Sequence, residues 1–227
     1  MGNPALFSLD PVELMIRVPI VLLALTVHEF CHGYFAYRMG DPTAYLQGRL
    51  TLNPLKHLDP LGAICLMFAP IGWAKPVPIN PLNFHDRRRG ILVSTAAGPL
   101  SNLAQAIVFA LLLRLLLMVG GGPLEVIGDE ADPRFRAAFM MGLVAVLINV
   151  GLAVFNCLPL FPLDGFHIVM QLLPPERQQR FAETAHFGPF AILGLIIIGH
   201  ATSVSVLEML IMPPVDLIFR YVVGIGM

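Results

Sequence analysis

The chain has 227 residues, of which 56% are hydrophobic and only 13% are Asp, Glu, Lys or Arg, with a mean hydropathy of +0.76. A soluble domain carries about 25% charged residues. So few charges cannot cover a water-exposed surface, so most of the outer face must meet lipid. The net charge of −1 argues against a nucleic-acid partner, which requires a basic face. The three widely spaced cysteines are typical of buried thiols rather than of a disulfide framework.

Four stretches are apolar enough to cross a bilayer, which takes about 20 mostly apolar residues. They cover residues 13–39, 90–113, 137–163 and 187–207. Residues 59–74 are also apolar but too short and too rich in Pro and Gly to span, so we expect a re-entrant loop or a short β-hairpin there. Residues 213–227 fit either an interfacial position or a partial dip into the membrane. The predicted fold is an all-α polytopic membrane protein with about four to five transmembrane helices.

The distribution of Lys and Arg predicts the orientation in the membrane. Seven of the fourteen lie between the first two spans, namely Arg38, Arg49, Lys56, Lys75, Arg87, Arg88 and Arg89. Because basic residues favour the cytoplasmic side, we expect segment 38–89 in the cytoplasm and loop 119–136 outside. Arg17 argues mildly for the opposite orientation.

The first span contains the pattern His-Glu-x-x-His, formed by His28, Glu29 and His32. Positions four apart share one face of a helix, so both imidazoles can reach one metal ion. Glu29 is then placed to act as a general base toward a water molecule at the metal. The alternative is a hydrogen-bonded polar cluster or a proton relay, because ionisable groups at membrane depth must pair or bind an ion.

A catalytic zinc requires three protein ligands, and Asp164 is the candidate for the third. It is the only carboxylate between Asp132 and Glu176, and it directly follows the third span. The predicted topology puts that end of the third span and the histidine end of the first span on the same, cytoplasmic side. The alternative is a turn residue, which the Asp-Gly pair favours by itself.

Five segments together resemble the site-2 protease family of intramembrane zinc metalloproteases, and in particular a compact branch without a PDZ domain. They are HEFCH at 28–32, LNPLKHLDPLG at 52–62, GWAKPVPINP at 72–81, GPLSN at 98–102 and NCLPLFPLDG at 156–165. The resemblance covers roughly residues 20–175.

The resemblance implies one zinc ion bound by His28, His32 and Asp164, with Glu29 as the general base. It places Asn156 near the scissile carbonyl, where its amide can donate to the developing oxyanion, and it gives Asn102 a supporting role in helix packing. It also implies that an unwound substrate pairs as an added strand with an extended segment, made of Gly72, Trp73, Ala74, Lys75, Pro76 and Val77.

The sequence departs from the family pattern in several places. The motif lies on the first helix, whereas many members have a helix before it, and no PDZ or CBS domain is expected in 227 residues. Phe166 and His167 follow Gly165 where a second glycine is common. His167 fits a supporting role or an extra ligand, with an ordinary polar residue at a helix start as the alternative. His57 is a further ligand candidate, with a plain loop histidine as the alternative.

The predicted function is an intramembrane zinc-dependent endopeptidase that cleaves within or next to transmembrane segments of membrane proteins. We expect one domain over residues 1–227, with a core at 13–175 and a C-terminal helix and tail at 187–227. The expected location is a bacterial or archaeal cell membrane, with the active site toward the cytoplasm and the oligomeric state open. The alternative is a non-catalytic metal-binding membrane protein or a metal transporter, which would place carboxylates in several helices.

Overall fold

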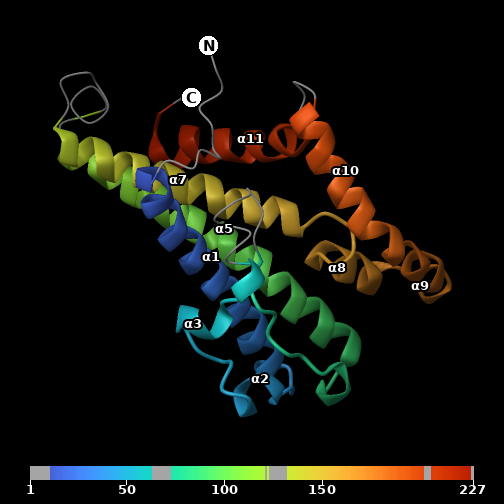
Figure 1. The fold of residues 1–227 in the computed structure, drawn as a ribbon. Helices are drawn as coiled ribbons and strands as arrows, with labels where there is room; N and C mark the ends of the chain where they lie inside the picture. The colour runs from blue at the N-terminus through green and yellow to red at the C-terminus, as the bar shows by residue number, and fades with distance from the viewer. Residues whose placement is uncertain (1–10, 63–72, 121, 123–131, 202–205, 226–227) are drawn as a thin grey trace.

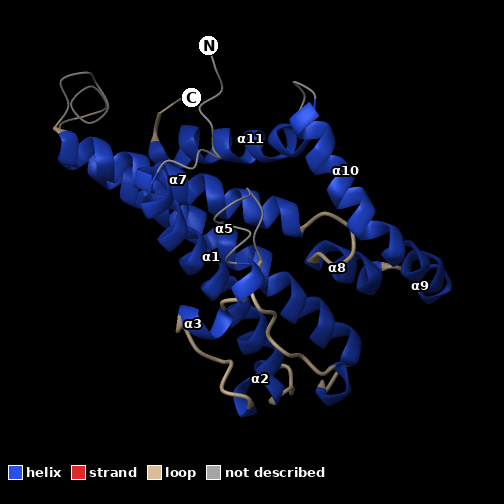
Figure 2. Cartoon of the chain, in the orientation of Figure 1, coloured by secondary structure: helices blue, strands red, loops and turns tan. Residues whose placement is uncertain are grey.

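A computed structural model describes residues 11–62, 73–120, 122, 132–201 and 206–225 of the chain. This part of the chain is helical, with loops between the helices (Figures 1 and 2). Within these ranges the only strand-like pairing outside helices is an isolated antiparallel bridge between Leu58 and Ala74. The all-helical prediction is confirmed. The β-hairpin expected over 59–74 stays a prediction, because residues 63–72 lie outside the described ranges.

Four helical stretches in the described part of the chain are long and apolar enough to cross a membrane. They are α1 (Pro11–Arg38), α5 (Arg87–Val119), α7 (Pro133–Asn156) and the stretch Pro175–Gly199, which joins α9 (Pro175–Ala182), η2 (Glu183–Phe187) and α10 (Gly188–Ala201). The chain is therefore a multi-pass membrane protein, as its composition predicted.

Two predicted span boundaries differ from the observed ones. The third span was expected to reach residue 163, but α7 ends at Asn156, because Pro159 and Pro162 cannot continue a helix. The fourth span was expected over 187–207, but α10 ends at Ala201 and a separate helix, α11 (Val206–Ile218), follows.

The C-terminal segment packs against protein. Helix α11 and the short helix η3 (Phe219–Val223) lie across α7 and α5 (Figure 1). Val215 and Phe219 are fully buried there, in one apolar cluster with Leu113 of α5 and Val146 of α7. The main apolar core of the described chain therefore ties this segment to the two central helices.

Helix α5 is the central element, because it packs against α1, α7 and α8 (Asp164–Leu172) (Figure 1). Its buried positions are mostly small residues, including Ala97, Gly98, Ala106 and Ala110. Small side chains let helix backbones approach closely, which is the main source of helix association in lipid. This close approach brings α1 and α8 together over one stretch of α5.

Short helices shape the loop between α1 and α5. These are α2 (Thr43–Leu46), α3 (Pro54–His57) and η1 (Pro81–Asn83). The fully buried carboxylate of Asp41 joins both ends of this loop, because Oδ1 accepts from Thr43 N (3.1 Å) and Asn83 Nδ2 (2.8 Å), and Oδ2 from Asn80 N (2.7 Å). Burial raises the pKa of Asp41, but the hydrogen bonds from Thr43, Asn83 and Asn80 together lower it by more. The pKa of Asp41 therefore lies below its usual value.

We expect Asp41→Asn to destabilise the protein at neutral pH by about 1–3 kcal/mol, because the amide puts a donor where the carboxylate accepts from donors. The folded-state pKa of Asp41 is depressed, so its contribution is present above the unfolded value of about 3.9 and is lost as pH falls below it. Thermal unfolding of detergent-purified protein between pH 3 and 7 measures both effects.

The control is Asp86→Asn, because Asp86 is exposed and caps α5 through Arg89 N, a cap that Asn also provides. Equal stability of Asp41→Asn and Asp86→Asn at pH 7, or an unchanged acid-induced loss in Asp41→Asn, would contradict the structural role of this carboxylate.

Candidate metal and catalytic site

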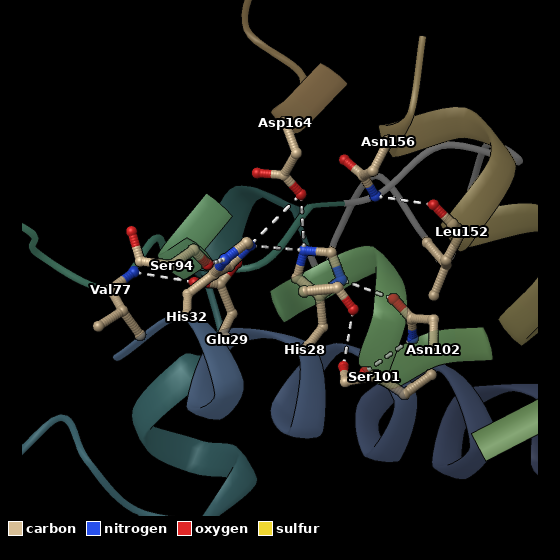
Figure 3. Close-up of polar contacts among 12 residues, drawn as sticks. His28, Glu29, His32, Val77, Ser94, Ser101, Asn102, Leu152, Asn156 and Asp164 are labelled. Carbon is tan, nitrogen blue, oxygen red and sulfur yellow. Dashed lines mark hydrogen bonds and ion pairs between the residues drawn. The ribbon is translucent and has the colours of Figure 1, made fainter. Parts of the chain in front are cut away.

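Two histidines of α1 and one aspartate of α8 meet inside the bundle (Figure 3). Asp164 Oδ2 lies 3.2 Å from His28 Nε2 and 3.3 Å from His32 Nε2, and the two Nε2 atoms are 2.9 Å apart. The histidines are 4% and 8% exposed. The structure therefore joins the two motifs that the sequence predicted to meet.

The other nitrogen of each ring makes a hydrogen bond that determines which ring nitrogen carries the proton. His28 Nδ1 donates to Asn102 Oδ1 (2.5 Å), and His32 Nδ1 donates to the backbone oxygen of Ser94 (2.7 Å), both on α5. Since these oxygens only accept, each Nδ1 carries a proton and each Nε2 of a neutral ring keeps its lone pair. Metal-binding histidines have this arrangement.

The donor set fits a zinc ion. Both Nε2 lone pairs and the Asp164 carboxylate point at one space, and Asp164 Oδ2 is buried without a hydrogen bond from the described residues. Ligand bonds of about 2.0–2.2 Å in a tetrahedron put neighbouring ligand atoms about 3.3–3.6 Å apart. The 3.2 Å and 3.3 Å from Asp164 Oδ2 to the two histidines are close to this range, and the 2.9 Å between the two Nε2 atoms is shorter.

Gly98 of α5 leaves this space open. A Cβ atom at this position would lie 2.4 Å from His32 Nε2 and 2.6 Å from His28 Nε2. Any larger residue would therefore enter the volume on which the ligand atoms converge. Gly165 has a similar role on the other side, because its Cβ would lie 2.2 Å from Cys157 O, so only glycine lets the start of α8 reach the end of α7.

Glu29 lies beside the histidines and contacts the loop. Its Oε2 accepts a hydrogen bond from Val77 N at 2.9 Å (Figure 3). Val77 is buried against α1, where a Cβ on Gly33 would lie 3.0 Å from Val77 Cγ1. The carboxylate expected to be the general base is thus held by the segment that the resemblance assigned to substrate binding.

That segment has an extended backbone held from one side. Lys75 N donates to His57 O (2.8 Å), and Arg49 Nη2 donates to Lys75 O (2.7 Å) and Pro76 O (3.2 Å). In the antiparallel bridge between Leu58 and Ala74, this hydrogen-bond pattern turns the N–H and C=O of Ala74 away from Leu58. Trp73 is 44% exposed. Gly72 lies outside the described residues.

Asn156 is the last residue of α7, and the end of α7 packs against the start of α8, because a Cβ on Gly165 would lie 2.2 Å from Cys157 O (Figure 3). Its Nδ2 donates to Leu152 O at 3.0 Å, which leaves the second hydrogen of the amide for another acceptor. One of the two donor hydrogens of this amide is therefore engaged in its own helix, next to the start of the helix that carries Asp164.

The two further histidines considered from the sequence do not join the cluster. Among the described residues, the group of potential ligands contains only His28, His32 and Asp164. The His167 ring packs at 6.1 Å from Phe161 and 5.6 Å from Phe166; burial lowers its pKa while the Asp164 charge opposes this. His57 is buried, and its Nε2 donates to Thr51 O (2.8 Å).

Sequence reasoning missed Ser94 and Asn149. The contact from Ser94 is a backbone carbonyl, which no residue type reveals. Asn149 of α7 is fully buried and accepts from Asn102 Nδ2 at 3.0 Å. An asparagine at the centre of an otherwise apolar span was the signal that could have identified it. Asn102, expected only to support packing, also contacts His28 directly.

Comparison with known proteins identifies the family. The model of peptidase family M50 matches residues 17–196. The chain belongs to this family. It is 41% identical to "Putative zinc metalloprotease YwhC" of Bacillus subtilis, over 84% of each chain. It is 32% identical to "Putative zinc metalloprotease Rip2" of Mycolicibacterium smegmatis, over 78% of this chain but only 64% of that relative's length. No solved structure matches the chain significantly.

Membership of M50, the site-2 protease family, confirms the resemblance drawn from the five motifs. The chain is a zinc metalloprotease with membrane-length helices, and its His-His-Asp cluster suits one metal ion.

We expect Gly98→Ala to lose most of the bound zinc, because the added methyl group would occupy the space between the ligand atoms. Zinc per chain, measured by elemental analysis of detergent-purified protein, checks this. The matched control is Gly194→Ala in α10, where an added Cβ has no neighbour within 4 Å. Wild-type zinc content and affinity in Gly98→Ala would show that the ion does not bind in this space.

Proposed function

We propose that this M50 protease is an intramembrane endopeptidase that hydrolyses peptide bonds within or next to transmembrane segments of membrane proteins. The observation that carries the proposal is the convergence of His28, His32 and Asp164 inside a bundle of membrane-length helices. A protease centre at this place can act on a substrate that is itself in the membrane.

The two histidines and Asp164 hold the zinc ion, which when bound activates water and polarises a carbonyl. Glu29 acts as the general base, since it adjoins His28 and, among the described residues, its carboxylate accepts a hydrogen bond through Oε2 alone, from Val77 N. Its Oε1 takes the proton from the attacking water and later transfers that proton to the leaving amine. The Val77 N–H meanwhile holds the carboxylate in one orientation.

Asn156 donates its second amide hydrogen to the oxygen of the scissile carbonyl as negative charge develops there. Its position at the end of α7, which packs against the start of α8, supports this role (Figure 3). Removing one such donor costs about 2.7–4 kcal/mol of transition-state stabilisation in well-studied acyl-transfer enzymes.

The substrate binds in an extended form along the segment of residues 72–77. A helical substrate must unwind first, because its carbonyl groups are engaged within the helix. The outward-facing N–H and C=O of Ala74 offer backbone partners for an added strand. Arg49 and His57 hold the segment from its other side. Because Val77 of the same segment bonds Glu29, the bound strand lies next to the general base.

The active site lies near the cytoplasmic face of a bacterial or archaeal cell membrane. Seven of the chain's fourteen Lys and Arg residues lie in segment 38–89, which runs from the end of α1 to the start of α5 and contains the loop that bonds Glu29. Basic segments of this kind stay on the cytoplasmic side.

The first experiment measures zinc per chain in the wild type, His28→Ala, Asp164→Ala and Glu29→Gln. We expect about one zinc in the wild type and in Glu29→Gln, and a loss of zinc in the two ligand variants. We expect Glu29→Gln to abolish cleavage of a reconstituted transmembrane substrate, because an amide cannot accept the proton of water. Zinc retained by Asp164→Ala would remove the third ligand, and zinc without cleavage by the wild type would favour a non-catalytic metal-binding protein.

We expect Asn156→Ala to lower kcat about 10²–10³-fold while zinc content stays at the wild-type level, because only the transition-state contact is lost. Cleavage rates at saturating substrate in proteoliposomes measure this. Asn156→Asp is the matched variant, since it keeps the size but lacks an amide donor, and it should be equally slow. A kcat within twofold of wild type in both variants would exclude the oxyanion role.

A further inference from the structure

We propose that Asn149 of α7 is a positioning residue for His28, acting through Asn102 of α5. The inference rests on the proposed function only in taking His28 as a zinc ligand. It adds a residue on a third helix that touches neither the metal nor the substrate and yet determines how one ligand presents its lone pair.

The contacts form a chain that begins at a backbone carbonyl of α7. Asn149 Nδ2 donates to Ala145 O at 2.9 Å, and Asn149 Oδ1 accepts from Asn102 Nδ2 at 3.0 Å. Asn102 Oδ1 then accepts from His28 Nδ1 at 2.5 Å (Figure 3). Both asparagines are 0% exposed and His28 is 4% exposed, so water does not substitute for any partner.

The chain has a direction, because each side-chain amide has one accepting end and one donating end. The Ala145 carbonyl can only accept, so it turns the NH₂ of Asn149 toward itself and the oxygen of Asn149 toward Asn102. That oxygen attracts the NH₂ of Asn102, whose own oxygen then faces His28. His28 must therefore protonate Nδ1, and its Nε2 presents a lone pair toward Asp164 and His32.

The opposite orientation of the Asn102 amide would disable the ligand. Its NH₂ group would face His28 Nδ1, which would have to be the accepting nitrogen, and the proton would move to Nε2 on the metal side. The Ala24 carbonyl also opposes this flip, but Asn102 Nδ2 lies 3.3 Å from it, a longer contact than the 3.0 Å to Asn149. Of the two acceptors that hold the Asn102 amide, Asn149 Oδ1 is thus the closer.

Substituting partners of metal-binding histidines typically costs about 10–100-fold in metal affinity. Asn149→Leu removes the acceptor while keeping a similar side-chain volume, and we expect it to weaken zinc binding by about 10–100-fold. Asn149→Asp, with its buried carboxyl group protonated, keeps an oxygen that can accept from Asn102 and an O–H that can donate to Ala145 O, and we expect its zinc affinity to be close to the wild-type value.

The experiment titrates zinc against a competing chelator in detergent-purified full-length protein and records the absorption spectrum of the cobalt-substituted form. Val150→Ala is the matched control, since Val150 is the next residue of α7, is 1% exposed and lies in the apolar core. We expect it to lose stability but to keep wild-type zinc affinity and an unchanged cobalt spectrum. Asn149→Ala serves as a second variant if Asn149→Leu does not fold.

Wild-type zinc affinity and cobalt spectrum in Asn149→Leu or Asn149→Ala would overturn the positioning role, as would an equal loss in Val150→Ala, which would indicate packing alone. His28→Ala, titrated in parallel, separates the two proposals. Zinc lost in His28→Ala but unaffected in Asn149→Leu overturns only this inference, whereas zinc retained in His28→Ala overturns the ligand assignment of the proposed function.

Discussion

Three atoms that each present a lone pair face one another in the interior of this bundle. Such an arrangement is stable only with positive charge between the atoms. Two imidazole nitrogens and one carboxylate oxygen lie 2.9–3.3 Å apart, and both rings donate their protons in the opposite direction. In a low-dielectric interior, unpaired polar groups are costly. The surrounding helices provide partners for the Nδ1 atoms of both histidines and for the Asn102 amide.

Helix α5 provides most of those partners from one face. Ser94, Gly98 and Asn102 are four residues apart, so they follow one another along the side of the helix that meets α1. Ser94 contacts His32 and Asn102 contacts His28, with Gly98 between them. The order of contacts is reversed along the two helices, as antiparallel neighbours require. Residue spacing on two helices therefore generates the ligand geometry together with the space for the ion.

The loop between α1 and α5 connects the segment proposed to bind substrate with Glu29, the proposed general base. Asp41 fixes both ends of the loop, and Arg49 holds the carbonyl groups of Lys75 and Pro76. Val77 packs where Gly33 has no side chain, and its N–H donates to Glu29. Most of these contacts engage backbone atoms, so the conformation of the loop matters more here than the identity of its exposed side chains.

The sequence by itself determined that this is a membrane protein with four apolar spans, and that His28 and His32 share one face of a helix with Glu29 beside them. Hydropathy and helical periodicity are local properties, so a single sequence reveals them. It also pointed to Asp164, the one carboxylate available at the end of the third span. Only the tertiary structure decided how α11 packs on α5 and α7, and which groups contact the predicted ligand residues. Asn149, Gly98 and the Ser94 carbonyl act across helix contacts, and the distance between two helices is not encoded in the local pattern of either one.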